Sequence, residues 1–184
     1  MGSQTPNLAY MEVVPAPLRF VLRDLAIAGF VIALWRLEFS LAGDAGPHLD
    51  AFRVVLGLAS VAVGALAHEW GHLLPSLMSG ATVHYPPGWF AKLLFDFDVE
   101  RNTRAQFLWM NLGGYLSVVL ALGVYSALLP LDRLAGQVAL VGIALGTSAV
   151  FVIELPVTIR VLGGERPPPA LVSNYPAGKF PDPS

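Results

Sequence analysis

Four long apolar segments run through this chain of 184 residues, and they constrain its fold more than any other feature. A transmembrane helix needs about 20 consecutive apolar residues to cross the hydrocarbon core of a bilayer, and each segment reaches that length. The segments extend approximately over residues 18–41, 52–78, 105–129 and 134–162. The sequence therefore predicts an all-α integral membrane protein, a four-transmembrane-helix bundle that forms a single domain over residues 1–166.

Composition favours the same class of protein. Hydrophobic residues make up 55% of the chain and charged residues 13%, with a mean hydropathy of +0.62, whereas a soluble domain is about 25% charged. The formal net charge of -2 provides no basic surface that could replace phosphate counterions, so we expect contact with a lipid bilayer and not with nucleic acid. Because the chain has no cysteine, any metal ion must be held by His, Asp or Glu.

The basic residues predict how the helices are oriented in the membrane. Most of them lie near the start of the first segment, between the second and third segments, or after the fourth (Arg19, Arg23, Lys92, Arg101, Arg104, Arg160, Arg166 and Lys179). The remaining three, Arg36, Arg53 and Arg133, lie at the opposite ends of the predicted segments. Since cytoplasmic loops are enriched in Lys and Arg, both termini are predicted to be cytoplasmic. The C-terminal stretch, residues 167–184, is rich in proline and is predicted to form an extended tail.

The second apolar segment contains an HExxH pentad, formed by His68, Glu69, Trp70, Gly71 and His72. On a helix the two histidines lie one turn apart on the same face, so that both imidazoles can bind one Zn²⁺ ion and the glutamate can reach metal-bound water. The alternative is a pair of histidines satisfied by ordinary hydrogen bonds. Three ionisable residues within five positions are costly in a membrane, which favours the metal-binding interpretation.

Helix geometry places two further polar residues at the depth of the pentad. With a rise of about 1.5 Å per residue, His72 lies roughly 9 Å and His68 roughly 15 Å from the predicted cytoplasmic end of their helix. By the same rise, Asn111 lies roughly 9 Å and Glu154 roughly 12 Å from that face. We therefore predict Glu154 as the third metal ligand, with Asp96 and Asp98 as competing candidates. The alternative for Glu154 is a buried carboxyl group that pairs with an arginine or stays protonated.

The segment between the second and third apolar stretches has the pattern of strands. Residues 94–100 alternate apolar and acidic side chains, which is typical of a strand with one wet face. Together with residues 81–85 they predict a short β-hairpin beside the metal-binding layer, whose edge could bind an unwound substrate segment by backbone pairing. The alternative is an amphipathic interfacial segment anchored by Trp89 and Phe90. His84 is interpreted as a solvated loop histidine.

Two stretches of the chain resemble the site-2 protease family of intramembrane zinc metalloproteases. Residues 68–83, which contain the pentad, are similar to the HExxH helix and the following strand of that family. Residues 106–117 resemble its next core helix, which carries a Gly-Pro-x-x-Asn pattern. The likeness covers roughly the second to fourth apolar segments, and only the pentad is a specific motif.

The chain departs from the family pattern at two places. Gly114 and Ser117 stand where the family has Pro and Asn, so Asn111 is the candidate to position substrate or stabilise the oxyanion in place of the family's asparagine. The family's third metal ligand is an aspartate in a Leu-Asp-Gly motif, and Leu162-Gly163-Gly164 lacks that aspartate. Glu154 would have to replace it.

The pentad and the resemblance together predict a zinc metalloendopeptidase-like protein that hydrolyses a peptide bond of a membrane protein substrate near the cytoplasmic side of the bilayer. In this hypothesis His68, His72 and Glu154 bind Zn²⁺, and Glu69 is the general base. Asn111 or Ser117 donates a hydrogen bond to the developing oxyanion. The alternative is a catalytically inactive relative that serves as a structural or assembly subunit of a larger membrane complex, with neighbouring membrane subunits as its partners.

Overall fold

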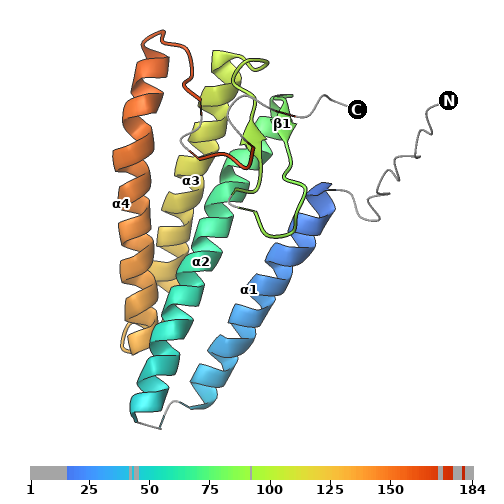
Figure 1. The fold of residues 1–184 in the computed structure, drawn as a ribbon. Helices are drawn as coiled ribbons and strands as arrows, with labels where there is room; N and C mark the ends of the chain where they lie inside the picture. Colours follow the sequence, from blue (N-terminus) through green and yellow to red (C-terminus); the bar gives the residue numbers. More distant parts are fainter. Residues whose placement is uncertain are drawn as a thin grey trace, which may run out of the picture.

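The computed structural model describes residues 16–41, 43, 46–91, 93–169, 172–175 and 180. Within these residues the chain forms four helices and two short strands (Figure 1). They follow in the order α1 (Ala16–Ser40), α2 (Pro47–Met78), β1 (Val83–His84), β2 (Asp96–Phe97), α3 (Arg104–Leu128) and α4 (Leu134–Leu162). The prediction of a mostly helical protein is confirmed. The second helix begins at Pro47 and not at residue 52, since proline is well suited to the first turn of a helix.

The helix α2, which carries the pentad, is the central helix of the structure. It packs against α1, α3 and α4, and α3 also packs against α4. The helices alternate in direction, so that the strands lie at one end of the molecule, where α2 ends and α3 begins (Figure 1). The start of α1 and the end of α4 lie at this end as well. The basic residues that were predicted to share one side are therefore gathered there, as far as the structure describes them (Arg19, Arg23, Arg101, Arg104, Arg160 and Arg166).

Three helices of the described chain, α2, α3 and α4, are long and apolar enough to cross a membrane. The first helix does not meet that criterion. Arg19, Arg23 and Asp24 lie near its start and Arg36 and Glu38 near its end, so charged side chains interrupt its apolar sequence. The predicted first segment is thus helical, but the count of four membrane spans stays a prediction.

At the end opposite the strands, a buried carboxylate joins three helices. Glu38 of α1 is fully buried, and its Oε1 accepts a hydrogen bond from Nε of Arg53 in α2 at 3.0 Å. Arg133, directly before α4, donates to the backbone carbonyl of Glu38 at 3.3 Å. A buried charge is tolerated only when it is paired, so this cluster fixes the end of α1 against α2 and α4.

The start of α3 is held against the end of α2 by side-chain hydrogen bonds. Thr103 and Gln106 form a reciprocal capping box at the first turn of α3. The side-chain amide of Gln106 also donates to the carbonyl oxygen of Ser79, just past α2, at 3.0 Å. These bonds set the height of α3 relative to the pentad in α2.

The strands are shorter than predicted. β1 and β2 pair antiparallel over two residues each, with Val83 opposite Phe97 and His84 opposite Asp96. Between them, residues 94 and 95 turn their side chains into the main hydrophobic cluster, which also includes Phe20 of α1 and Leu73 of α2. The segment before β2 is therefore packed against the helices that carry the pentad.

The interpretation of His84 as a solvated histidine is wrong. Its side chain is buried, and its Nε2 donates to the carboxylate of Asp98 at 3.0 Å. Asp98 also accepts the backbone N–H groups of Glu100 and Arg101, at 3.1 Å each. Burial opposes ionisation of Asp98, but the hydrogen bonds from His84, Arg101 and Glu100 outweigh it and hold the pKa of this carboxyl group below its ordinary value of 3.8.

Acidification is expected to weaken this part of the fold. Because the pKa of Asp98 is lower in the folded chain than in the unfolded one, its stabilising effect is fully present above the unfolded pKa and is lost as the pH falls through the folded pKa. The thermal unfolding midpoint of the detergent-solubilised protein should therefore be lower at about pH 3 than at about pH 7. The Asp98→Asn variant should start from a lower midpoint and show a smaller decline. An equal decline in both proteins would contradict the assignment.

Candidate metal centre

Two helices bring three potential metal ligands together. His68 and His72 lie one turn apart on α2, and Glu154 reaches them from α4. One ligand atom from each residue lies within 4.8 Å of the others. The Nε2 atoms of the two histidines are 3.2 Å apart, and the carboxylate oxygens of Glu154 lie 3.3 Å from Nε2 of His68 and 3.5 Å from Nε2 of His72. The predicted set of two histidines and Glu154 is therefore close in space.

The other nitrogen of each imidazole is bound to a backbone carbonyl of α3. Nδ1 of His68 lies 3.2 Å from the oxygen of Gly114, and Nδ1 of His72 lies 3.1 Å from the oxygen of Met110. A carbonyl oxygen can only accept, so each Nδ1 carries the hydrogen. In the neutral imidazoles both Nε2 lone pairs then point toward each other and toward the carboxylate. Histidines that bind metals in proteins are oriented in this way.

Glu154 has an oxygen that needs a partner. Its Oε2 is buried and makes no hydrogen bond to any described residue. Four atoms that only accept, two nitrogens and two oxygens, thus converge on one point, an arrangement that a cation would stabilise. Ligands at about 2.0 to 2.1 Å around a tetrahedral Zn²⁺ ion are about 3.3 Å apart. The observed separations of 3.2 to 3.5 Å fit an ion of that size.

Glycine residues allow α3 to approach α2 closely enough for these contacts. A Cβ atom at Gly71 would lie 2.8 Å from the carbonyl oxygen of Gly113, and a Cβ atom at Gly113 would meet the ring of Pro75. A Cβ atom at Gly114 would lie 2.5 Å from Nε2 and 2.7 Å from Nδ1 of His72. Such distances do not occur in real proteins, so these glycines are required by the site. The adjacent pair Gly113-Gly114 was the signal in the sequence.

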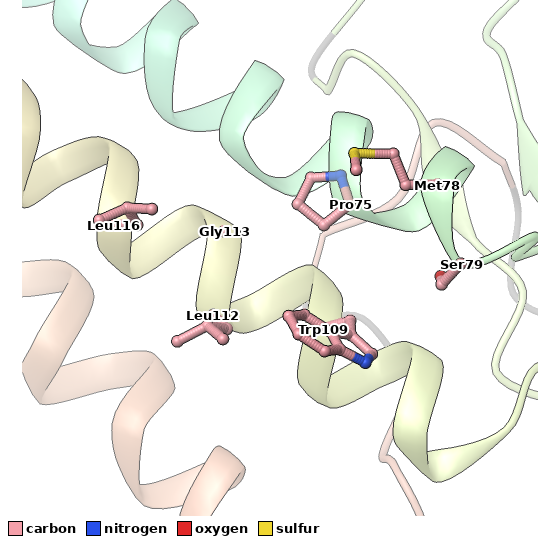
Figure 2. A pocket seen from close by; sticks show the side chains of 7 residues that line it. All are labelled: Pro75, Met78, Ser79, Trp109, Leu112, Gly113 and Leu116. Atoms are coloured by element: carbon pink, nitrogen blue, oxygen red, sulfur yellow. The ribbon is translucent and has the colours of Figure 1, made fainter.

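An apolar groove lies beside this helix contact. It has a volume of about 360 Å³ and is lined by residues from the end of α2 and from α3 (Pro75, Met78, Ser79, Trp109, Leu112, Gly113 and Leu116). Figure 2 shows Pro75 of α2 facing Gly113 of α3. Gly113 thus borders the groove, while its neighbour Gly114 contacts the imidazole of His72.

Glu69 lies next to the ligands in sequence and is held by a different contact. Its Oε2 accepts a hydrogen bond from the backbone N–H of Leu94 at 3.2 Å. The neighbouring indole of Trp70 donates to the carboxylate of Asp24 in α1 at 2.8 Å. Glu69 therefore binds the loop before β2 and Trp70 binds α1, while the two histidines face α3 and α4.

The remaining predicted residues have distinct environments. Asn111 is buried in α3, one residue after the carbonyl that binds His72, and no hydrogen bond joins it to the ligand group within the described chain. The hydroxyl of Ser117 donates to the oxygen of Gly114 at 2.7 Å. The competing ligand candidates bind elsewhere: Asp98 pairs with His84, and Asp96 accepts hydrogen bonds from Asn174.

No family model, curated protein or solved structure matches this chain. The likeness to the site-2 protease family therefore stays a prediction that rests on the residues quoted above.

Proposed function

We propose that this protein is a zinc-dependent hydrolase that cleaves a peptide bond of a membrane protein substrate. The observation that supports it most strongly is the arrangement of the two histidines. Both Nδ1 atoms are committed to carbonyl oxygens, so both Nε2 lone pairs face the carboxylate of Glu154. This is the orientation that a metal site needs.

The donor set favours zinc over magnesium or calcium. Two imidazoles and one carboxylate are the protein ligands of many catalytic zinc sites, whereas magnesium and calcium prefer oxygen ligands alone. When bound, the ion would supply Lewis acidity to the scissile carbonyl group and lower the pKa of a water molecule. Three protein ligands leave a position open for that chemistry.

Glu69 is the general base of the proposed reaction. Its carboxylate is not among the atoms that converge on the ion position, yet it follows His68 directly in the chain. It takes a proton from the attacking water and delivers a proton to the leaving amine as the C–N bond breaks. Asn111 is the better candidate for the oxyanion donor, because the hydroxyl of Ser117 already donates to Gly114.

The proposed site lies inside the membrane, near the cytoplasmic face. We place α1 as a fourth crossing helix, with its charged residues near the two interfaces and an apolar stretch between Asp24 and Arg36. The end of the bundle that carries the strands is proposed to be cytoplasmic because the basic residues gather there. In this proposal the chain is a divergent member of the site-2 protease family, with Glu154 in place of the family's aspartate.

Zinc content tests the metal centre directly. The full chain, purified in detergent and equilibrated with Zn²⁺, is expected to bind about one equivalent, as for a site with three protein ligands. Replacement of Glu154 by alanine should weaken zinc binding by more than about a hundredfold. Loss of a residue that only hydrogen-bonds to a metal ligand already lowers metal affinity by about 10- to 100-fold.

Glu165→Ala is the matched control for this experiment, because Glu165 is exposed just beyond the end of α4. It should retain the zinc. Full zinc binding by the Glu154→Ala variant would exclude Glu154 as a ligand. A wild-type chain that binds no zinc would instead favour the non-catalytic membrane subunit.

A further inference from the structure

One residue of the C-terminal tail, Asn174, bonds the loop that leads into β2. Its side-chain amide donates to the carbonyl oxygen of Leu93 at 3.1 Å and accepts the N–H of Leu93 at 3.2 Å. The same amide donates to the carboxylate of Asp96 at 2.7 Å, and the backbone N–H of Asn174 lies 3.2 Å from both oxygens of that carboxylate. Asn174 therefore holds the loop at residue 93 and at residue 96.

Leu94 lies between these two attachment points and is the residue that contacts Glu69. Its N–H donates to Oε2 of Glu69 at 3.2 Å. Its side chain is buried in the hydrophobic cluster with Leu73 of α2. The direction of the Leu94 N–H bond depends on the residues on either side of it. Asn174 binds the backbone of Leu93 before it and the side chain of Asp96 two residues after it.

Further tail contacts keep Asn174 in place. The hydroxyl of Tyr175 donates to the carbonyl oxygen of Tyr85 at 2.5 Å. The ring of Phe180 stacks on His84, with centroids 4.3 Å apart and an interplanar angle of 6°. The tail follows α4, which carries Glu154, so one continuous stretch of chain contributes the third ligand of the proposed metal site and then reaches the loop that contacts Glu69.

We propose that Asn174 is a positioning residue for Glu69, acting through the backbone of Leu93 and Leu94. The proposal rests on the proposed function, since it assigns the tail a part in holding the general base. A carboxylate must keep its direction to take a proton from water, and one hydrogen bond from Leu94 is a main restraint on Glu69. In this proposal Asp96 holds Asn174 by a hydrogen bond and is not a metal ligand.

Replacement of Asn174 by alanine is the first test, carried out on the full chain loaded with zinc. The substrate is a single-span peptide that carries a fluorophore and a quencher on opposite sides of helix-breaking residues. We expect kcat to fall about tenfold, because a misdirected general base loses part of its usual contribution of about 10² to 10⁴ in rate. KM and the zinc content should stay unchanged. Val172→Ala, an exposed tail residue, is the matched control and should have no effect.

Amide hydrogen exchange provides a readout that does not depend on cleavage. Exchange at Leu93 and Leu94 should be faster in the Asn174→Ala variant than in the wild type, because the loop loses its restraint. In the Asn174→Asp variant two carboxylates face each other, so the loss should be at least as large. Combining Asn174→Asp with Asp96→Asn restores a neutral amide opposite a carboxylate, and should recover part of both kcat and protection.

Several outcomes would overturn the positioning role. Unchanged kcat and unchanged exchange in the Asn174→Ala variant would show that the tail does not act on Leu94. A higher kcat would show that the tail blocks the site and does not support it. A fall in zinc content parallel to kcat would place the effect at the metal ligands. A wild-type chain that cleaves no peptide would refute the proposed function, and the exchange at Leu94 would still decide whether Asn174 holds this contact.

Discussion

Replacement of Glu69 by glutamine is expected to abolish peptide cleavage while leaving zinc bound. A general base contributes about 10² to 10⁴ in rate, and glutamine cannot take up the proton. The side-chain oxygen of glutamine can still accept the N–H of Leu94, so the loop should keep its position. Zinc binding should persist because the converging ligand atoms belong to His68, His72 and Glu154 and not to Glu69.

The measurement pairs cleavage of the fluorogenic single-span peptide with the zinc content of the same preparation. Glu100→Gln makes the same chemical change at an exposed position next to the strands and should leave both values unchanged. If Glu69→Gln cleaved the peptide at the wild-type rate, the general base would have to be sought elsewhere. If it lost its zinc, Glu69 would be a ligand, and the assignment of Glu154 would have to be revised.

Replacement of Gly114 by alanine is expected to destroy the metal site. The new Cβ atom would lie 2.5 Å from Nε2 and 2.7 Å from Nδ1 of His72, so the imidazole must leave its position or α3 must move away from α2. Either movement separates His72 from the carbonyl of Met110 that orients it. We expect the loss of zinc binding and a lower thermal unfolding midpoint, since overpacking costs about 1 to 3 kcal/mol.

Gly123→Ala is the control, because Gly123 lies on the same helix and a Cβ atom there would meet nothing within 4 Å. This variant should bind zinc normally and be at least as stable as the wild type, as alanine is the better helix former. The double variant His72→Ala with Gly114→Ala removes the colliding ring. It should recover the thermal midpoint without recovering zinc, and failure to recover would mean that the collision lies elsewhere.

The helices could be predicted from sequence because their signal is local. The length of an apolar segment is compared with the thickness of a bilayer, and this comparison does not depend on the rest of the fold. The last helix, Leu134–Leu162, begins and ends at the predicted residues. The first helix was also predicted, but its five charged side chains exclude it from the helices that meet the length and composition criterion for crossing.

The segment between α2 and α3 was predicted less well, because its structure depends on distant residues. Alternation over residues 94–100 indicated a longer strand, yet only Asp96 and Phe97 pair with β1. The side chain of Leu94 is instead buried in the helix cluster. His84 was interpreted as solvated because the sequence does not reveal that Asp98 lies opposite it and that Phe180 covers its ring.

Local patterns in the sequence predicted the residues of the candidate site and their common level along the helices. The spacing of His68 and His72 places them on one face of a helix, and a fixed rise per residue puts Glu154 at the same level on another helix. Depth along a helix follows from counting residues. The direction in which each helix faces does not, because rotation about the helix axis is set by the side chains between neighbouring helices.

The direction in which each helix faces is set by the contacts between the helices. The absence of side chains at Gly71, Gly113 and Gly114 lets α3 approach α2 until its carbonyl oxygens meet both Nδ1 atoms. The same packing turns Glu154 of α4 toward the histidines, and the tail that follows α4 brings Asn174 to the loop that holds Glu69. These contacts join residues that are far apart in the chain, so no local pattern in the sequence could encode them.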